Sequence, residues 1–286
     1  MHIVVCIKQV PDSTHIRVHP VTNTIMRQGV PAIINPYDLF AIEEALRLKD
    51  RHGGRVTVIT MGPAQAAPAL RKALSFGCDD AILISDKIFS GADTLATSYV
   101  LASAIKTLNA ENPVDVVFTG KQTIDGDTAQ VGPGIAKRLD LELLTYVSRI
   151  IEVDLTERRI VVERRAEGGV QVLQTRLPAL VTMLEGSNEL RFATTPNMFR
   201  AARAEIRRWD RDSAGIEDIK LVGLKGSPTI VARVFGPTSR AEKAIQIPFD
   251  SSAPDSAGTA LLEKVLAESP RVKKELAYRR QPGHTD

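Results

Sequence analysis

The chain has 286 residues, of which 43% are hydrophobic and 25% are charged, as is ordinary for a soluble globular protein. This length allows one large domain with an appendage, or two domains. The formal net charge is +3, the difference between 37 basic and 34 acidic side chains. So small an excess argues against general binding of nucleic acids or membrane surfaces.

Cysteine and histidine usage gives no sign of a metal centre. The two cysteines, Cys6 and Cys78, form no C-x-x-C pair, and the five histidines form no ligand pair at helical spacing. Neither a zinc site nor a disulfide framework is therefore expected. Because no apolar run has the length of a membrane span or of a secretory leader, we expect a cytoplasmic protein.

Apolar strands alternate with amphipathic helices in the first half of the chain. In chain order, the pattern predicts a strand at Ile3–Ile7, a helix from Pro36 to Gly53 with Asn35 as its N-cap, a strand at Val56–Met61, a helix at Ala64–Phe76, a strand at Ala81–Ser85, a helix at Thr94–Leu108, a strand at Val114–Phe118 and a helix at Ile135–Leu139. This alternation indicates an α/β fold, in which a mostly parallel open sheet carries helices on both faces.

The pattern changes after this point. Apolar and polar residues alternate in three segments, Tyr146–Val153, Arg159–Arg165 and Val170–Thr175, which we expect to be antiparallel strands added to the sheet, each with one solvated face. The apolar run Leu180–Leu184 predicts a further buried strand.

The C-terminal third is expected to serve a partner. A basic helix should begin at Pro196 and end near Trp209, and two late helices are expected at Thr259–Leu266 and Val272–Tyr278. From Asp210 onward too few apolar residues remain for a separate core, so this part is a disordered extension or an arm on another subunit. We therefore divide the chain into an α/β domain over 1–195 and a recognition helix with its arm over 196–286.

The most informative segment is Gly120–Gly134, which is rich in Gly and small hydroxyl residues and lies between a strand and a helix. Such a loop brings backbone N–H groups and a helix N-terminus close to phosphate oxygens. Asp125 and Asp127 carry acceptors for ribose hydroxyls or for helix capping, and Thr128 and Gln130 can hydrogen-bond phosphate or base edges. The alternative is a capped turn that binds no ligand.

Several segments in this order resemble the beta (small) subunit of electron transfer flavoproteins, and Lys121–Asp125 is the most specific of their motifs. The matching segments are Cys6–Val10, Asn35–Lys49, Met61–Gln65, Gly120–Gly134 and Asn188–Asn197. The resemblance implies one α/β domain related to adenine-nucleotide-binding, Rossmann-like folds. It also implies a C-terminal arm that embraces a larger alpha subunit, which holds its own FAD.

The family contains two types of small subunit. Members that only relay electrons bury a structural AMP and usually carry Ile-Asp-Asp-Asp-x-Asn-Gln-Thr, whereas electron-bifurcating members bind a second FAD in that place. In this chain Gly126 replaces an acid, Ala129 an amide and Val131 a hydroxyl, which is similar to the bifurcating type. The loss of one carboxylate lowers repulsion toward a diphosphate, and glycine allows a close backbone approach.

The resemblance implies cofactor contacts at the strand ends and in the loop. We predict contacts with FAD, or with AMP in the alternative, at Cys6, Lys8, Asn35, Met61, Gly62, Thr123, Asp125, Gly126, Asp127, Thr128, Ala129, Gln130 and Val131. Most loop residues would act through backbone N–H groups. Cys6 is expected to form an apolar wall beside adenine, and Lys8 either neutralises phosphate or is an ordinary surface lysine. Met61 and Gly62 line the adenine pocket or merely pack a turn.

A docking surface is implied at 185–199, the segment with which family members bind acyl-CoA dehydrogenases or similar partners. The predicted partner-binding residues are Arg191, Thr195, Pro196, Met198, Phe199, Arg200 and Arg203. Met198 and Phe199 would supply an apolar anchor, and the arginines would steer acidic partners. Relay members carry leucine where this chain has Thr195, so docking is expected to differ. The alternative is a helix that packs only on its own domain.

The implied function is that of the beta subunit of a bifurcating heterodimer. Its FAD takes electrons from NADH and passes one to ferredoxin or flavodoxin; the other goes through the alpha-subunit FAD to a quinone reductase or acyl-CoA dehydrogenase. No catalytic side chain is expected, because the redox chemistry belongs to the flavin. The alternatives are a relay subunit with AMP and a stand-alone nucleotide-binding stress-type module. An ordinary NAD dehydrogenase is disfavoured, since no G-x-G-x-x-G follows Ile3–Ile7.

Overall fold

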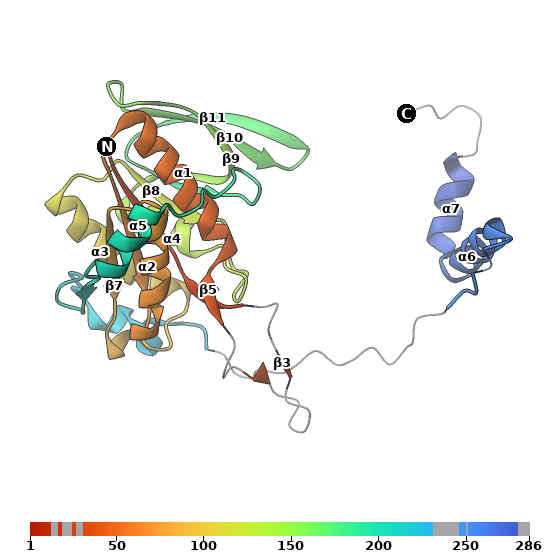
Figure 1. Cartoon of the computed structure of the whole chain (residues 1–286), viewed down its shortest axis with the longest axis horizontal. Coiled ribbons are helices and arrows are strands. Elements are labelled where there is room, and N and C mark those ends of the chain that lie inside the picture. Colours follow the sequence, from red (N-terminus) through yellow and green to blue (C-terminus); the bar gives the residue numbers. More distant parts are fainter. Residues whose placement is uncertain (13–16, 19–24, 27–30, 231–245, 250, 280–286) are drawn as a thin grey trace. The chain divides into compact units, whose positions relative to one another are not determined.

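A computed structural model of the chain describes residues 1–12, 17–18, 25–26, 31–230, 246–249 and 251–279. It divides into two compact units, Met1–Gly236 and Pro237–Asp286 (Figure 1). The first unit contains the sheet and its helices. The second contains α6 (Pro254–Glu268) and α7 (Pro270–Arg279), which confirms the two late helices predicted from the sequence.

A nine-stranded sheet, as far as the described residues extend, has the order β11-β10-β9-β12-β8-β1-β6-β7-β13. Its central parallel strands are β12 (Ala179–Met183), β8 (Val116–Gly120), β1 (His2–Cys6), β6 (Arg55–Met61), β7 (Asp80–Ile84) and β13 (Arg207–Trp209). Two short antiparallel pairs lie outside it, β2 (Gln9–Pro11) with β5 (Ala32–Ile34) and β3 (Arg17–Val18) with β4 (Ile25–Met26). The predicted mostly parallel sheet is confirmed.

Both faces of the sheet are covered by helices, because alternate side chains of β1 enter different core clusters. Ile3 and Val5 belong to the cluster of α1 (Pro36–His52) and α2 (Ala67–Phe76). Val4 and Cys6 belong to the cluster of α3 (Thr94–Glu111) and α4 (Val131–Leu139). A strand in which every residue is buried requires such double cover.

Local sequence explains where several helices begin and end. Pro36 starts α1 at a position where no backbone N–H is needed, and Gly53 ends it at φ +69°. Asp93 caps α3 by accepting hydrogen bonds from the amides of Leu95 and Ala96. Single-turn helices are η2 (Ala64–Ala66), η3 (Lys87–Phe89), η4 (Ile219–Leu221) and η5 (Gly223–Gly226).

A curled ribbon forms one edge of the sheet. It consists of β9 (Glu142–Asp154), β10 (Arg159–Ala166) and β11 (Gly169–Arg176). As predicted, β10 is antiparallel to both neighbours, whereas β9 also pairs parallel with β12. Tyr146 adopts φ +58° where the register of β9 shifts, and its amide donates to Thr182 Oγ1 at 3.1 Å. This β-bulge turns the long strand from one partner to the other.

The basic helix is shorter than the sequence indicated. Helix α5 (Thr195–Arg203) ends six residues before Trp209, and the prediction that it continues to Trp209 is wrong. Trp209 instead pairs with β7 as part of β13, and its indole is buried in the α3–α4 cluster under the guanidinium of Arg207. Burying the large indole at the sheet edge outweighs the helical spacing of the basic residues.

Residues after Trp209 continue to pack on the first unit. Ala214 and Val222 are buried in the α3–α4 cluster. Gly223, at φ +56°, lies directly against the backbone of Ile88. These residues, which were predicted to belong to the arm, lie in the first unit. The arm itself stays a prediction.

Candidate functional site

A crevice is expected where the strand order reverses. From β1 the chain passes to its neighbour β6 and then to β7, and it returns through α3 to β8 on the other side of β1. In open parallel sheets ligands bind outside the carboxyl ends of the strands at such a switch point. The segments that follow β1 and β8, residues 7–12 and 121–130, lie at this position.

Asn35 is the N-cap residue of α1, as predicted, but its side chain fixes the loop after β8. Its side chain makes no capping hydrogen bond. Its Nδ2 donates to Gln122 O at 2.8 Å, and its Oδ1 accepts from Ile124 N at 3.1 Å. The fully buried side-chain amide of Asn35 thus pairs with one backbone donor and one backbone acceptor of the loop. If it capped the helix instead, these two loop groups would lose their partner.

Asp38 joins the two strand ends. Its Oδ2 accepts from Lys8 N at 2.7 Å and its Oδ1 from Gly120 N at 3.2 Å. Burial raises the pKa of this carboxyl to about 7, against the opposite effect of these hydrogen bonds. Sequence reasoning treated Asp38 as an acid of the first helical turn and missed this contact, because its partners lie 30 and 82 positions away.

Side chains of the loop at 121–130 mostly pair with other protein groups. The Lys8 ammonium contacts both oxygens of Asp125 at 2.8 and 2.7 Å. Gln122 Nε2 donates to Asp127 Oδ1 at 2.8 Å, and Thr94 Oγ1 donates to Gln130 Oε1 at 2.8 Å. These contacts stabilise the conformation of the loop, and its carboxylates bind protein groups here.

The backbone at the tip of the loop is left open. Asp127 and Ala129 have φ of +49° and +54°, a left-handed conformation uncommon in residues other than glycine. In the part of the chain that the structure describes, the amides of Thr128 and Ala129 donate to no protein acceptor. Successive amides around a left-handed residue form a concave site for an anion. Gly126 is exposed here, and Thr123 Oγ1 would lie 3.4 Å from a Cβ added to it.

The start of α4 adds a helix N-terminus and an unpaired hydroxyl. Val131 is its first residue. Thr119 Oγ1 is buried without a hydrogen-bond partner, and a Cβ added to Gly132 would lie 2.9 Å from it. A Cβ added to Gly134 would lie 2.7 Å from Ser98 Cβ. These two glycines therefore serve the close packing of α4 on β8 and α3, and not the approach of a ligand.

The remaining predicted cofactor residues end the neighbouring strands. Cys6 is buried, and burial raises the pKa of its thiol, followed by the effect of Asp38, so it stays protonated and behaves as an apolar group. Met61 packs partly buried on the α3–α4 cluster, and the amide of Gly62 donates to Ile84 O at 3.0 Å. Their predicted contact with adenine stays a prediction.

Comparison with known proteins identifies the family. The model of the electron transfer flavoprotein domain matches residues 22–214. The chain belongs to the electron transfer flavoprotein family. It is 63% identical to the protein FixA of Azotobacter vinelandii over 279 residues, 98% of this chain and 99% of the relative. It is 62% identical to FixA of Azorhizobium caulinodans, over 97% of this chain and 98% of that one.

The subunit type follows from a further relative. The electron transfer flavoprotein subunit beta of Clostridium acetobutylicum is 48% identical over 234 residues, 82% of this chain and 87% of its own. The recognition of a beta-type electron transfer flavoprotein subunit from the sequence is thus confirmed. Among the described residues, no helix has the length and apolarity to cross a membrane, and no three His, Cys, Asp or Glu side chains gather as a metal site would require.

The predicted docking surface of this family member is anchored by two of its arginines. Arg191 pairs with Glu43 at 2.9 Å and with Asp50 at 2.9 Å, and Arg200 donates to the carbonyls of Leu74 and Cys78 at 3.2 and 2.8 Å. In this state both guanidinium groups hold the segment on α1 and α2. Their predicted role in steering partners stays a prediction.

Exposed apolar side chains lie in the same segment as Arg191 and Arg200. Met198 and Phe199 are 56% and 60% exposed, and Phe192, absent from the predicted set, is 95% exposed. Its signal in the sequence was a lone aromatic residue in a polar loop. Thr195 and Pro196 are the first residues of α5, whose N-cap is Thr194. Arg203 is exposed and pairs with no acidic group of the described residues.

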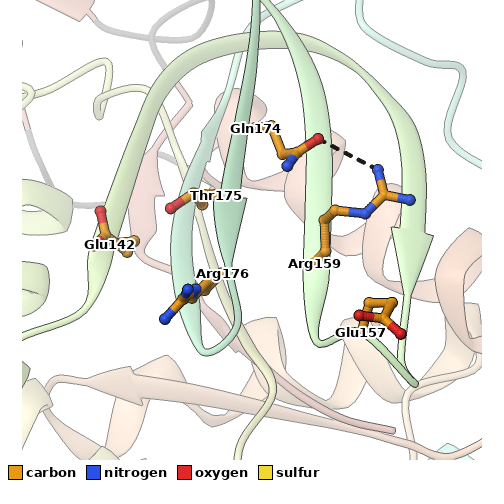
Figure 2. A pocket seen from close by; sticks show the side chains of 6 residues that line it. All are labelled: Glu142, Glu157, Arg159, Gln174, Thr175 and Arg176. Carbon is orange, nitrogen blue, oxygen red and sulfur yellow. Dashed lines mark hydrogen bonds between the residues drawn. The ribbon is translucent and has the colours of Figure 1, made fainter.

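A polar hollow of about 610 Å³ lies elsewhere, on the curled ribbon (Figure 2). Arg159 donates to Gln174 across it at 3.4 Å. It is lined by Glu142, Glu157, Arg159, Gln174, Thr175 and Arg176. Glu142 pairs with Ala179 at the amino-terminal end of β12, whereas the expected crevice lies beyond the carboxyl ends of the strands. No predicted site residue lines the hollow.

Proposed function

We propose that this chain is the beta subunit of a heterodimer with an alpha-type subunit and binds the adenosine diphosphate portion of FAD in the β1–β8 crevice. The observation that carries the proposal is the pair of open amides at Thr128 and Ala129 beside the N-terminus of α4. Phosphate oxygens accept hydrogen bonds from backbone amides of this kind.

The residues present fit an anionic nucleotide. Lys8 is half-exposed and bound to Asp125, so it can exchange that carboxylate for a phosphate with little movement of its ammonium. Protonated Cys6 offers an apolar surface at the end of β1. When bound, FAD supplies the ability to accept an electron pair and release single electrons, while the protein binds and orients it.

In the full proposal, FAD takes electrons from NADH in the cytoplasm. One electron goes to ferredoxin or flavodoxin, and the other goes through the alpha-subunit FAD to a quinone reductase or acyl-CoA dehydrogenase. Support for this type over the AMP-binding relay comes from Gly126, Ala129 and Val131 in the loop. Thr123 Oγ1 would lie 3.4 Å from a Cβ at Gly126, so a Cβ at this position makes no clash.

Cofactor content separates the two types. The heterodimer is purified after co-expression and its nucleotides are extracted and counted. About two FAD and no AMP per dimer supports the proposal. About one FAD with one AMP contradicts bifurcation and identifies the relay type. A chain that is stable and binds a nucleotide without any alpha-type subunit points to the stand-alone module.

Partner surfaces complete the proposal. The exposed Phe192, Met198 and Phe199 would bind the electron-transfer partner. The second unit would bind the alpha-type subunit, because Leu261, Leu262 and Val265 on α6 are exposed and an apolar helix face in water requires cover.

A further inference from the structure

Asp38 lies outside the set of residues that the sequence assigns to the crevice, yet it contacts both of the strand ends that form it. Its two oxygens accept from the amides of Lys8 and Gly120 at 2.7 and 3.2 Å. We propose that Asp38 is a positioning residue, which holds the segments after β1 and β8 at the spacing that nucleotide binding requires. This inference rests on the proposed nucleotide function and assigns a residue to it.

The contact suits aspartate and does not suit asparagine. Each carboxyl oxygen accepts from one amide, whereas an asparagine would accept with one atom and present an N–H group to the other amide. No residue larger than glycine fits at position 120, because a Cβ added there would lie 2.5 Å from Asp38 Oδ1 and 2.6 Å from the backbone carbonyl carbon of Tyr37. Asp38 and Gly120 are therefore fitted to each other.

The charged neighbours of Asp38 are engaged with other groups. The Lys8 ammonium, which favours ionised Asp38, pairs with Asp125. Lys121, after β8, lies over the Tyr37 ring at 5.0 Å and pairs with Glu185 at 3.4 Å. Cys6, on β1, stays protonated. Titration of Asp38 thus changes the charge of a group that no arginine or lysine contacts directly in the described residues.

Asp115 provides a matched control on the same two strands. It immediately precedes β8, and its Oδ2 accepts from His2 N at 2.8 Å. It therefore ties β1 to β8 at their amino ends, opposite the crevice, and also pairs with Arg158 at 2.8 Å. Both Asp38→Asn and Asp115→Asn lose a carboxylate that accepts a backbone amide, but only one lies at the crevice.

The experiment uses the full-length chain co-expressed with its alpha-type subunit. Hydrogen-exchange protection is measured for segments 7–12 and 119–131, and the affinities for FAD and for AMP are titrated. We expect Asp38→Asn to lower protection and affinity about tenfold or more, as for a lost charge-assisted hydrogen bond, and Asp115→Asn to leave both within about twofold. Equal effects of the two variants would overturn the inference.

The pH dependence adds a readout that a purely structural role does not move. Local opening that frees Asp38 returns its pKa from about 7 to the ordinary value of about 3.9, so opening becomes easier as pH rises. Wild-type protection of the two segments should therefore fall between about pH 5 and about pH 7, and Asp38→Asn should lack this fall. If that variant does not fold, the wild-type profile is compared with that of Asp115→Asn, which should show the same fall. Protection that is flat or rises across this range contradicts the inference. A wild type that binds neither FAD nor AMP, but keeps this profile, refutes the proposed function and leaves the positioning role supported.

Discussion

The loops that follow β8 and β12 are both polar and both are attached to α1, but they leave different groups uncovered. The loop at 121–130 is held by Asn35 and leaves main-chain amides open. The loop at 184–194 is held by Asn188, which donates to Phe40 O at 3.0 Å, and by Arg191, and leaves the ring of Phe192 in solvent. Open amides suit an anion, and an open aromatic ring suits a protein surface.

The comparison teaches that anchoring contacts and uncovered groups carry different information. One helix supplies the anchors of both loops, with Asn35 and Asp38 at its start and Glu43 and Glu44 along its length. Changes at the anchors should alter stability and loop order, whereas changes at the uncovered groups should alter binding alone. The predictions below test that division.

The largest effect is expected at Gly120. In Gly120→Ala the new methyl group would meet Asp38 Oδ1 at 2.5 Å and the Tyr37 backbone at 2.6 Å, and neither can move without breaking the crevice. We expect the free energy of unfolding, measured with urea, to fall by about 4 kcal/mol, or the variant to fail to fold. Gly126→Ala, in the same loop but without a clash, should stay within about 0.5 kcal/mol of wild type. Similar stabilities would contradict the division.

Ionisation of Asp38 should come next. Its folded pKa of about 7 exceeds the unfolded value of about 3.9, so the folded state holds a proton that the unfolded state has lost. Stability from this group is complete below about pH 4 and falls as pH rises to about 7, by up to about 4 kcal/mol. Urea unfolding at several pH values should show this slope in wild type relative to Asp38→Asn. The same slope in both would assign it to another group.

Removal of an anchor of the second loop should have a moderate effect. The Glu43 side chain is only 5% exposed and accepts from Arg191 at 2.9 and 3.1 Å. Arg191→Ala leaves this carboxylate with Arg47 and the backbone amide of residue 191, and the free energy of unfolding should fall by about 2 kcal/mol. Nucleotide affinity should not change. The exposed Arg203→Ala serves as the control, and a loss of stability as large as that of Arg191→Ala would contradict the assignment.

The smallest effect on stability is expected at Phe192. Phe192→Ala removes a ring that is 95% exposed, so unfolding should shift by less than about 0.5 kcal/mol. Electron transfer to a purified acyl-CoA dehydrogenase or quinone reductase should slow about tenfold if the ring is an interface anchor. The control is Val170→Ala, on an exposed edge strand, which should leave that rate unchanged. Equal rates in the two variants would show that Phe192 does not belong to the partner-binding surface.

Local sequence determined most of the secondary structure. Runs such as Val114–Phe118 and the alternation of strands with helices predicted the parallel sheet, because burial on both faces demands continuous apolar runs. Periodicity failed at Trp209, where spacing along the chain indicated a helix and the sheet edge offered the larger burial. The family likewise followed from motifs, since they are strings of neighbouring residues.

Tertiary structure alone decided what the side chains of those motifs do. Asn35 turned from its own helix to a loop 87 and 89 positions away, Asp38 joined two strand ends, and Arg191 bound α1 and not solvent. A sequence specifies which donors and acceptors exist, but which of them meet depends on the strand order. These contacts decide which backbone amides stay unpaired and which aromatic ring stays exposed, and so which groups can bind a ligand or a partner.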